Sequence, residues 1–169
     1  FLAQSASIMP GRTNVGGDVF VTDLQTGEQF WASVNLPSPI LSGYRCLAPV
    51  VTPDGRTVFF KVTTSSTYLL QQDLTTDETI VITSSTHPST PPALSADGRW
   101  LAFEDEGIYL RDLRDGTDQL AGYGWGPLLT PDARHVLFTG NDYQVYLHDV
   151  IAGTTRLIIG GIGGVPLKL

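Results

Sequence analysis

Apolar and polar residues alternate in short runs along the chain, and each run ends at a cluster of Gly, Pro, Asp, Asn, Ser or Thr. Alternation with a period of two residues is typical of a β-strand that buries one face. Residues 18–24 (DVFVTDL) are a clear example, with Val19 and Val21 on one face and Phe20 and Thr22 on the other. No stretch sustains the apolar spacing of a helix, so the pattern predicts an all-β fold.

Residues 92–122 hold the most regular series of strands and turns. The glycine-rich segment 122–126 (GYGWG) comes next; it follows no expected helix, and we interpret it as a flexible crossing to the next unit. Within residues 92–122, strands are expected at 92–95, 100–103, 108–113 and 119–121. The same series recurs, with strands expected at 1–7, 18–24 and 28–34; at 46–52, 57–62, 68–74 and 79–83; and at 127–130, 135–139, 144–150 and 155–159.

Two landmarks keep these units in register. In three units a proline stands five residues before a turn aspartate: Pro49 and Asp54, Pro92 and Asp97, Pro127 and Asp132. In all four units the third strand ends at an Asp that is followed by Leu or Val: Asp23, Asp73, Asp112 and Asp149. Successive copies of this second landmark lie 50, 39 and 37 residues apart. A period of about 40 residues with four strands per unit is typical of a β-propeller.

We therefore predict a single propeller domain over residues 1–169, built of about four blades that are each a four-stranded antiparallel sheet. Pro166 aligns with the landmark prolines, so we expect the last strand of the chain to complete the first blade. Such pairing would close a ring of four blades. The alternatives are a segment of a larger ring and a half-ring completed by a second copy. The expected blades span 1–34 with 165–169, then 44–83, 92–122 and 127–159.

The recurring aspartates are interpreted as turn residues rather than catalytic acids. In Asp54-Gly55 and Asp97-Gly98, the carboxylate can accept bonds from its own turn and the glycine tolerates positive φ. Asp132 holds the same place in the last unit, but Ala133 replaces the glycine. We expect a strained turn or another turn type there.

The motif [ST]-x-D-G-R, found at 52–56 and 95–99, resembles the WD40-like (PD40) repeats of TolB-type β-propellers. Residues 19–27 and 108–113 look like the third strand and following turn of that family's repeat. The resemblance covers nearly the whole chain. It implies a propeller in an extracytoplasmic protein, periplasmic or secreted, and some propellers of this kind are attached to serine peptidases of the prolyl oligopeptidase type.

Composition and charge exclude several classes of protein. The net charge of −7 and the absence of a basic stripe argue against binding to nucleic acid. No apolar run reaches 18 residues, so no transmembrane helix is expected. Cys46 lies in an apolar stretch and is expected to be a buried thiol. The chain begins with Phe1, so we expect a processed or partial chain.

The sequence offers little catalytic chemistry. The three histidines, His87, His135 and His148, do not have metal-ligand spacing, and the peptidase motif G-x-S-x-G is absent. The acidic loops at 105–106 and 141–142 lack the spacing of a calcium loop and are interpreted as solvated turns. We expect no enzymatic activity, no cofactor and no metal ion.

Tyr44, Tyr123 and Trp125 fall in expected crossings between blades, and we consider them candidate partner contacts at the rim. The competing interpretation is that each of these aromatic side chains only covers the hydrophobic core. The leading hypothesis is a protein-interaction scaffold, an accessory subunit of a larger extracytoplasmic complex. The alternatives are a propeller that binds a small ligand or a glycan, and the gating propeller of a larger serine hydrolase.

Overall fold

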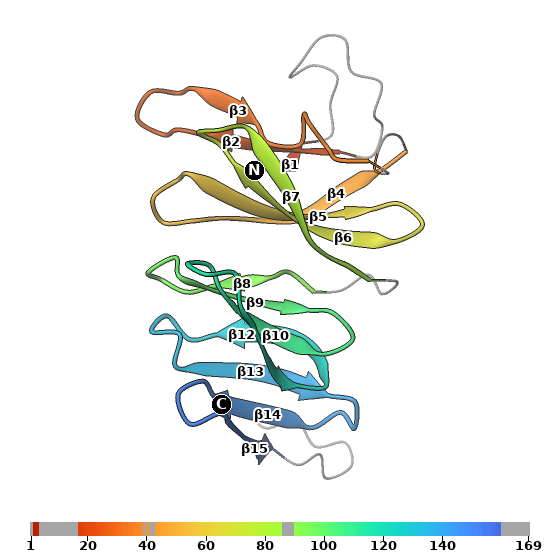
Figure 1. Ribbon diagram of the computed structural model, residues 1–169, viewed down its shortest axis with the longest axis vertical. Coiled ribbons are helices and arrows are strands. Elements are labelled where there is room, and N and C mark those ends of the chain that lie inside the picture. Colours follow the sequence, from red (N-terminus) through yellow and green to blue (C-terminus); the bar gives the residue numbers. More distant parts are fainter. Residues whose placement is uncertain (1, 4–16, 39, 41–42, 86–89, 160–169) are drawn as a thin grey trace. The chain divides into compact units, whose positions relative to one another are not determined.

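The protein is described here from a computed structural model, in which residues 2–3, 17–38, 40, 43–85 and 90–159 are placed. These residues form strands, turns and loops only, which confirms the all-β prediction (Figure 1). None of them belongs to a helix that could cross a membrane. Two compact units divide the chain, residues 1–92 and residues 93–169.

Each unit contains two antiparallel sheets whose strands follow one another in chain order. The first unit has a three-stranded sheet, β1 (Leu2–Ala3), β2 (Asp18–Thr22) and β3 (Gln29–Trp31), and a four-stranded sheet, β4 (Arg45–Val51), β5 (Thr57–Thr63), β6 (Thr67–Asp73) and β7 (Glu78–Ser85). The second unit has two four-stranded sheets, β8 (Ala93–Leu94), β9 (Trp100–Glu104), β10 (Ile108–Asp112) and β11 (Asp118–Gly122), then β12 (Gly124–Leu129), β13 (His135–Gly140), β14 (Val145–Asp149) and β15 (Thr154–Ile159).

The three four-stranded sheets match the expected second, third and fourth blades, and most of their strand boundaries agree within two residues. We call these sheets blades 2, 3 and 4. The first sheet has three described strands, and its expected fourth strand at 165–169 lies outside the described residues, as does His87. One expectation is corrected in part. The chain does pass from blade 3 to blade 4 within segment 122–126, but the segment is not a flexible crossing, because β11 ends at Gly122, β12 begins at Gly124 and only Tyr123 separates the two strands.

The turn that joins the first two strands of a blade is built in the same way three times. In blade 3, Ser95 Oγ donates to Asp97 Oδ1 at 2.6 Å and accepts from the Trp100 N–H at 2.9 Å. The Arg99 N–H donates to the same carboxylate oxygen at 3.0 Å. Thr52 and Thr130 repeat the contacts of Ser95 in blades 2 and 4, as do Asp54 and Asp132 those of Asp97.

Ala133 adopts the same turn as the glycines that it replaces. Its φ is 57°, against 73° for Gly55 and 70° for Gly98. A left-handed backbone costs an L-residue roughly 1–2 kcal/mol. Of the two expectations for this turn, the structure therefore shows the strained one.

The second landmark aspartate connects the turn after the first strand of a blade to the turn after the third strand. Asp112 Oδ1 accepts from the Arg114 N–H at 3.0 Å, and Asp112 Oδ2 accepts from Arg99 Nε at 2.9 Å. The Leu113 N–H donates to the carbonyl oxygen of Arg99 at 2.8 Å. Both turns of a blade therefore lie at the same end of the sheet, as a chain-order meander requires.

The landmark prolines mark a β-bulge in two of the three blades. Ala48 and Pro49 together face one residue of β5, and Gly126 and Pro127 do the same against β13. The first residue of each pair has positive φ, 51° and 70°. Proline is tolerated there because a bulged residue need not donate to the ladder.

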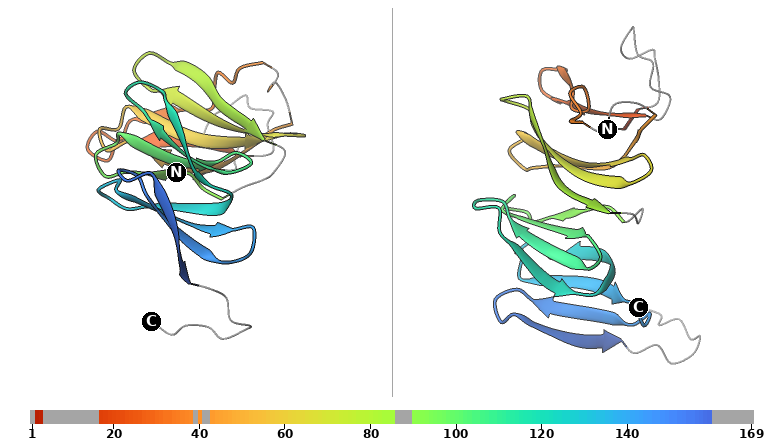
Figure 2. Two further views of the ribbon diagram at one scale, coloured as in Figure 1. Left: turned by 60° about the horizontal axis from the view of Figure 1, so that its bottom comes forward. Right: turned by 45° about the vertical axis from the view of Figure 1, so that its right-hand side comes forward.

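Each unit has its own hydrophobic core. In the first, buried side chains of β2, such as Val19, pack with β5 side chains such as Phe60. In the second, Ala102 and Leu110 of blade 3 pack with Val136 and Phe138 of blade 4. The two sheets of this unit face each other, with β12 against β8 and β9, and β15 against β11 (Figure 2).

Candidate functional site

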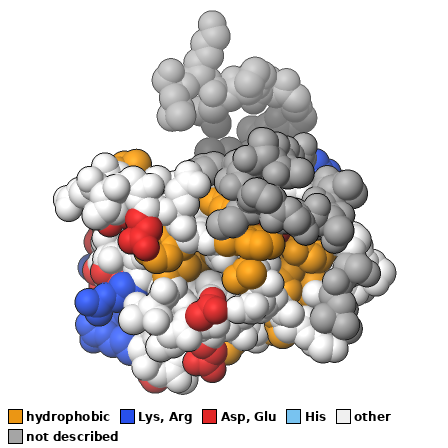
Figure 3. Space-filling model, turned by 90° about the horizontal axis from the view of Figure 1, so that it is seen from above, with side chains coloured by type: hydrophobic (Ala, Val, Ile, Leu, Met, Phe, Trp, Pro, Cys, Tyr) orange, Lys and Arg blue, Asp and Glu red, His pale blue; other side chains and the backbone are white. Residues whose placement is uncertain are grey.

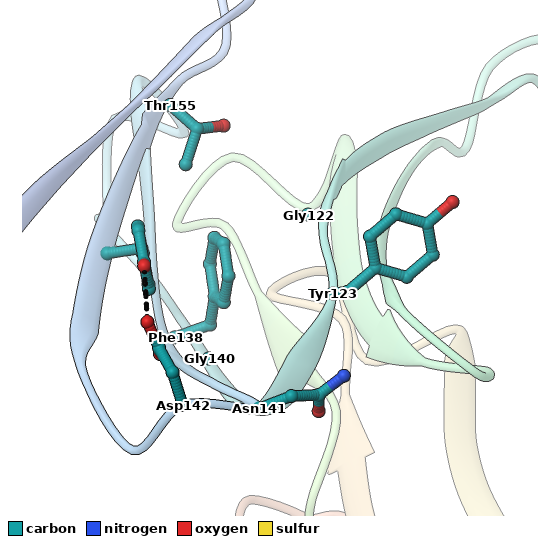
Figure 4. A pocket seen from close by; sticks show the side chains of 8 residues that line it. Gly122, Tyr123, Phe138, Gly140, Asn141, Asp142 and Thr155 are labelled. Atoms are coloured by element: carbon teal, nitrogen blue, oxygen red, sulfur yellow. Dashed lines mark hydrogen bonds between the residues drawn. The ribbon is translucent and has the colours of Figure 1, made fainter.

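A pocket of about 330 Å³ opens in the second unit between the junction of β11 with β12 and the hairpin that joins β13 to β14 (Figure 4). Its volume is near the lower end of the range for ligand sites, which suits one side chain or a small molecule. It is lined by Gly122, Tyr123, Phe138, Gly140, Asn141, Asp142, Tyr146 and Thr155.

Two stacked rings and two glycines form the apolar wall of this pocket. Phe138 and Tyr146 pair across β13 and β14, and their ring centroids lie 5.7 Å apart at an interplanar angle of 17°. Gly122 approaches Phe138 so closely that a Cβ would lie 2.4 Å from its Cζ. A Cβ on Gly140 would lie 2.6 Å from Cε2 of Tyr146. The absence of side chains at these glycines leaves the rings accessible from the pocket.

A carboxylate stands at the mouth of the pocket. Asp142 Oδ2 accepts from the Tyr146 hydroxyl at 2.8 Å, the bond that is dashed in Figure 4, and from Gln144 Nε2 at 3.0 Å. The Tyr146 hydroxyl lowers the pKa of Asp142, and the same bond raises the pKa of Tyr146. Asp142 is thus ionised at neutral pH. It is the only charged residue among those that line the pocket.

The hairpin itself is held in a strained conformation. Tyr143 has a φ of 63° and is 80% exposed, and its ring meets Trp125 edge-on with centroids 5.3 Å apart. A bulky residue at positive φ is an outlier that costs energy, and such outliers cluster at functional sites. Neither ring lines the pocket: Trp125 pairs with Thr139 and so lies on the face of the sheet opposite Phe138 and Tyr146, while Tyr143 follows the two hairpin residues at the pocket mouth.

A partly buried polar network connects Thr155 to the buried His148. The Thr155 hydroxyl donates to the Ala121 carbonyl at 2.7 Å, so it accepts from Nδ1–H of His148 at 2.9 Å. His148 Nε2 then accepts from Gln119 Nε2 at 3.4 Å. Burial lowers the pKa of His148, against a smaller upward effect of Asp149. A neutral His148 therefore links β11 to β15.

The structure places the three predicted rim residues in different surroundings. Tyr123 lines the pocket and is 64% exposed; in Figure 4 its ring and that of Phe138 lie on opposite sides of the β11–β12 segment. Trp125 lies within β12 rather than in a crossing, because it pairs with Thr139 of β13. Tyr44 belongs to the first unit, where it is half-buried and its hydroxyl donates to Asp18 Oδ1 at 3.4 Å.

Sequence reasoning missed the pocket wall. Phe138, Tyr146 and Thr155 come together only through the strand register. Asn141 and Asp142 do form the expected solvent-exposed turn, but the sequence does not show that this turn borders the pocket. The signal that could have found them is the alignment of Phe138 and Tyr146 with Phe103 and Tyr109 of blade 3, which also stack, with centroids 5.9 Å apart.

Other features of the described residues offer less chemistry. An apolar pocket of about 220 Å³ in the first unit is lined by β2, β4 and β5 and has no ionisable side chain. Cys46 is fully buried. No three His, Cys, Asp or Glu side chains of the placed residues gather as metal ligands. The face in Figure 3 shows acidic and hydrophobic side chains interspersed, with the larger group of basic side chains at its left edge.

Comparison with known proteins points to one fold. No protein-family model matches the sequence, and no curated protein matches it. Among solved structures, TolB from Acinetobacter baumannii has a TM-score of 0.59 at 20% identity, covering 83% of this chain and 37% of TolB. A structure from a study of two prolyl endopeptidases has a TM-score of 0.63 at 14% identity, covering 88% of this chain and 27% of its own.

The β-propeller domain of the trilobed protease from Pyrococcus furiosus has a TM-score of 0.57 at 14% identity, covering 71% of this chain and 44% of that domain's chain. The chain thus spans less than half the length of each of these structures. Their likeness confirms, at the level of the fold, the resemblance that the repeat motifs indicated. The chain has the β-propeller fold, made of four-stranded antiparallel blades.

Proposed function

We propose that this chain is a non-catalytic interaction module, a scaffold that binds a protein partner through the pocket and the aromatic side chains beside it. The observation that carries the proposal is the strained β13–β14 hairpin, which lines the pocket with Asn141 and Asp142 and holds the next residue, Tyr143, exposed at positive φ. Exposed aromatic side chains on a rigid frame are typical of the centres of protein interfaces.

The use of the acidic side chains supports the non-catalytic part of the proposal. Asp97 and Asp112 accept hydrogen bonds from backbone N–H groups of their own turns, and Asp54, Asp132 and Asp149 do the same. The hydroxyl of Ser95 lowers the pKa of Asp97, and the guanidinium of Arg99 lowers the pKa of Asp112; the backbone bonds add to both effects. A general acid needs a raised pKa, which this environment opposes.

The resemblance to TolB-type repeats and the likeness to TolB support an extracytoplasmic setting, as an accessory subunit of a larger complex. A gating role beside a hydrolase is the second candidate, favoured by the likeness to a structure from the prolyl endopeptidase study. Full-length sequence around the chain separates these two candidates, because a hydrolase would continue into a segment with G-x-S-x-G.

Site-specific crosslinking tests the interaction proposal. A photoreactive benzoylphenylalanine replaces Tyr123, Tyr143 or, as a control, Ile151, which is 78% exposed at the opposite end of β14. In cells of the source organism, Tyr123 and Tyr143 positions should crosslink to the same protein and the Ile151 position should not. Equal labelling at all three positions, or no crosslinked protein, contradicts the proposal.

A further inference from the structure

The pocket in the second unit has a polarity that selects among ligands. Its wall is apolar, formed by Phe138, Tyr146 and two glycines, while its mouth carries the ionised carboxylate of Asp142. No Lys, Arg or His is among its lining residues. An anion would meet the negative charge of Asp142 and no positively charged donor, so the pocket suits a cation with an apolar stem.

The carboxylate is held in place for such a ligand. The Tyr146 hydroxyl and Gln144 Nε2 both bond Oδ2, and the Gln144 N–H donates to Oδ1 at 3.1 Å. Oδ1 lies above the bare Cα of Gly140, 2.8 Å from where a Cβ would stand. Each carboxylate oxygen can accept two hydrogen bonds, so Oδ1 retains capacity for a further donor on the pocket side.

Blade 3 shows the same chemistry satisfied within the chain. Its stacked pair, Phe103 and Tyr109, occupies the positions of Phe138 and Tyr146. The guanidinium carbon of Arg111 lies 5.9 Å from the Phe103 ring centroid. Arg111 also forms two bonds of 2.8 Å to the carboxylate of Asp118. A guanidinium beside stacked rings, paired with a carboxylate, is therefore an arrangement that this blade architecture accommodates.

Blade 4 has no counterpart of that arginine. His148 takes the position of Arg111 and Thr155 that of Asp118, and the ring nitrogens of His148 bond Thr155 and Gln119. The carboxylate of blade 4, Asp142, lies instead in the β13–β14 hairpin. Asp142 and the Phe138–Tyr146 pair thus offer a carboxylate and an aromatic wall to a cation from outside the chain. Arginine suits this site better than lysine because its planar fork can stack on a ring and still donate to a carboxylate.

We propose that the Phe138–Tyr146–Asp142 pocket binds an arginine side chain of the protein partner. This inference rests on the proposed function and specifies the chemistry of the same site. The aliphatic stem of the arginine lies against Tyr146 and Phe138, and its guanidinium donates to Asp142 Oδ1 at the mouth. Tyr123, on the outer rim, contacts residues of the partner next to that arginine.

Amide NMR spectra of the whole ¹⁵N-labelled chain test the proposal with N-acetyl-arginine methylamide as the probe. The neutral isostere N-acetyl-citrulline methylamide and the lysine analogue are run beside it. Arginine should shift the signals of Gly122, Gly140 and Asp142 in a saturable manner, and citrulline should not. Asp142→Asn should weaken arginine binding about tenfold, the value of one charge-assisted contact. The matched control Asp115→Asn removes an exposed carboxylate outside the pocket and should leave binding unchanged.

Several results would overturn the inference. They are equal binding of citrulline, binding of lysine at least as tight as that of arginine, unchanged binding by Asp142→Asn, or no shift up to the solubility limit of the probe. The crosslinking experiment separates this failure from that of the proposed function. A partner that crosslinks at Tyr123 equally well with and without Asp142→Asn would keep the interaction module and discard the arginine site.

Discussion

Replacing Gly124 by alanine tests the finding that segment 122–126 is an ordered strand junction. Gly124 pairs with Gly140 at the start of β12, and a Cβ there would lie 2.0 Å from the carbonyl oxygen and 2.8 Å from the carbonyl carbon of Thr139. These are backbone atoms of β13, which cannot rotate away as a side chain can. Strand β12 must therefore move off β13 where the two strands first pair.

The magnitude follows from two contributions. Overpacking against a fixed neighbour typically costs about 1–3 kcal/mol, and each ladder hydrogen bond lost with the displaced strand costs about 1 kcal/mol more. We expect Gly124→Ala to lower the free energy of unfolding by about 2–4 kcal/mol. The comparison is Gly153→Ala, where a Cβ meets nothing within 4 Å but φ is +64°. Its cost is the left-handed strain alone, about 1 kcal/mol.

Urea denaturation of the whole chain, followed by far-ultraviolet circular dichroism, measures both variants. An unchanged m-value licenses the comparison of their midpoints. Gly122→Ala should fall between the two, because its Cβ would meet the Phe138 ring, which can shift in part. If Gly124→Ala costs no more than Gly153→Ala, β12 does not approach β13 as described, and a flexible crossing at 122–126 regains support.

Two further predictions concern hydrogen bonds inside the second unit. Ser95 is buried, and Ser95→Ala removes the hydroxyl that accepts from the Trp100 N–H. This change should lower the free energy of unfolding by about 1–2 kcal/mol in thermal or urea melts. Ser95→Thr should be nearly neutral because Thr52 and Thr130 make the same bonds, and a loss equal to that of alanine would contradict this account. Burial lowers the pKa of His148, so below about pH 6.5 the unfolded chain binds more protons than the folded chain. The stability that neutral His148 contributes is therefore complete above that pH and falls below it. The free energy of unfolding should drop less between about pH 7.5 and pH 5.5 for His148→Gln than for the unchanged chain. Equal drops for the two proteins would refute the assignment.

The repeated part of the fold could be predicted because its chemistry is local. Asp97 bonds the hydroxyl two residues before it and the N–H two residues after it, and Asp112 bonds the N–H of Arg114. Such bonds need particular residue types at fixed short spacing, so the same residue types recur at the same positions in each repeat. The period, the register and the strand order of the blades follow from these recurring residues.

The pocket could not be predicted in the same way because its contacts join distant residues. Gly122 and Phe138 touch across two blades, and Tyr146 meets Phe138 only through the register of β13 and β14. Glycine also has two uses, since it permits a flexible crossing and it permits a close approach of backbones. The sequence GYGWG is compatible with both uses, and in the structure Gly122 and Gly124 permit a close approach.

The division between repeated and unrepeated residues follows the two ends of a blade. In a four-stranded meander, the turns after the first and third strands share one end, as the bond from the Leu113 N–H to the Arg99 carbonyl shows. The hairpin after the second strand and the passage to the next blade lie at the opposite end. The landmark aspartates occupy the first end, and the pocket, built from the β13–β14 hairpin and the β11–β12 junction, occupies the second. Because the first end is fixed by its own hydrogen bonds, the second end can change its residues without loss of the blade. Binding chemistry in this chain is therefore expected where the repeat is least regular.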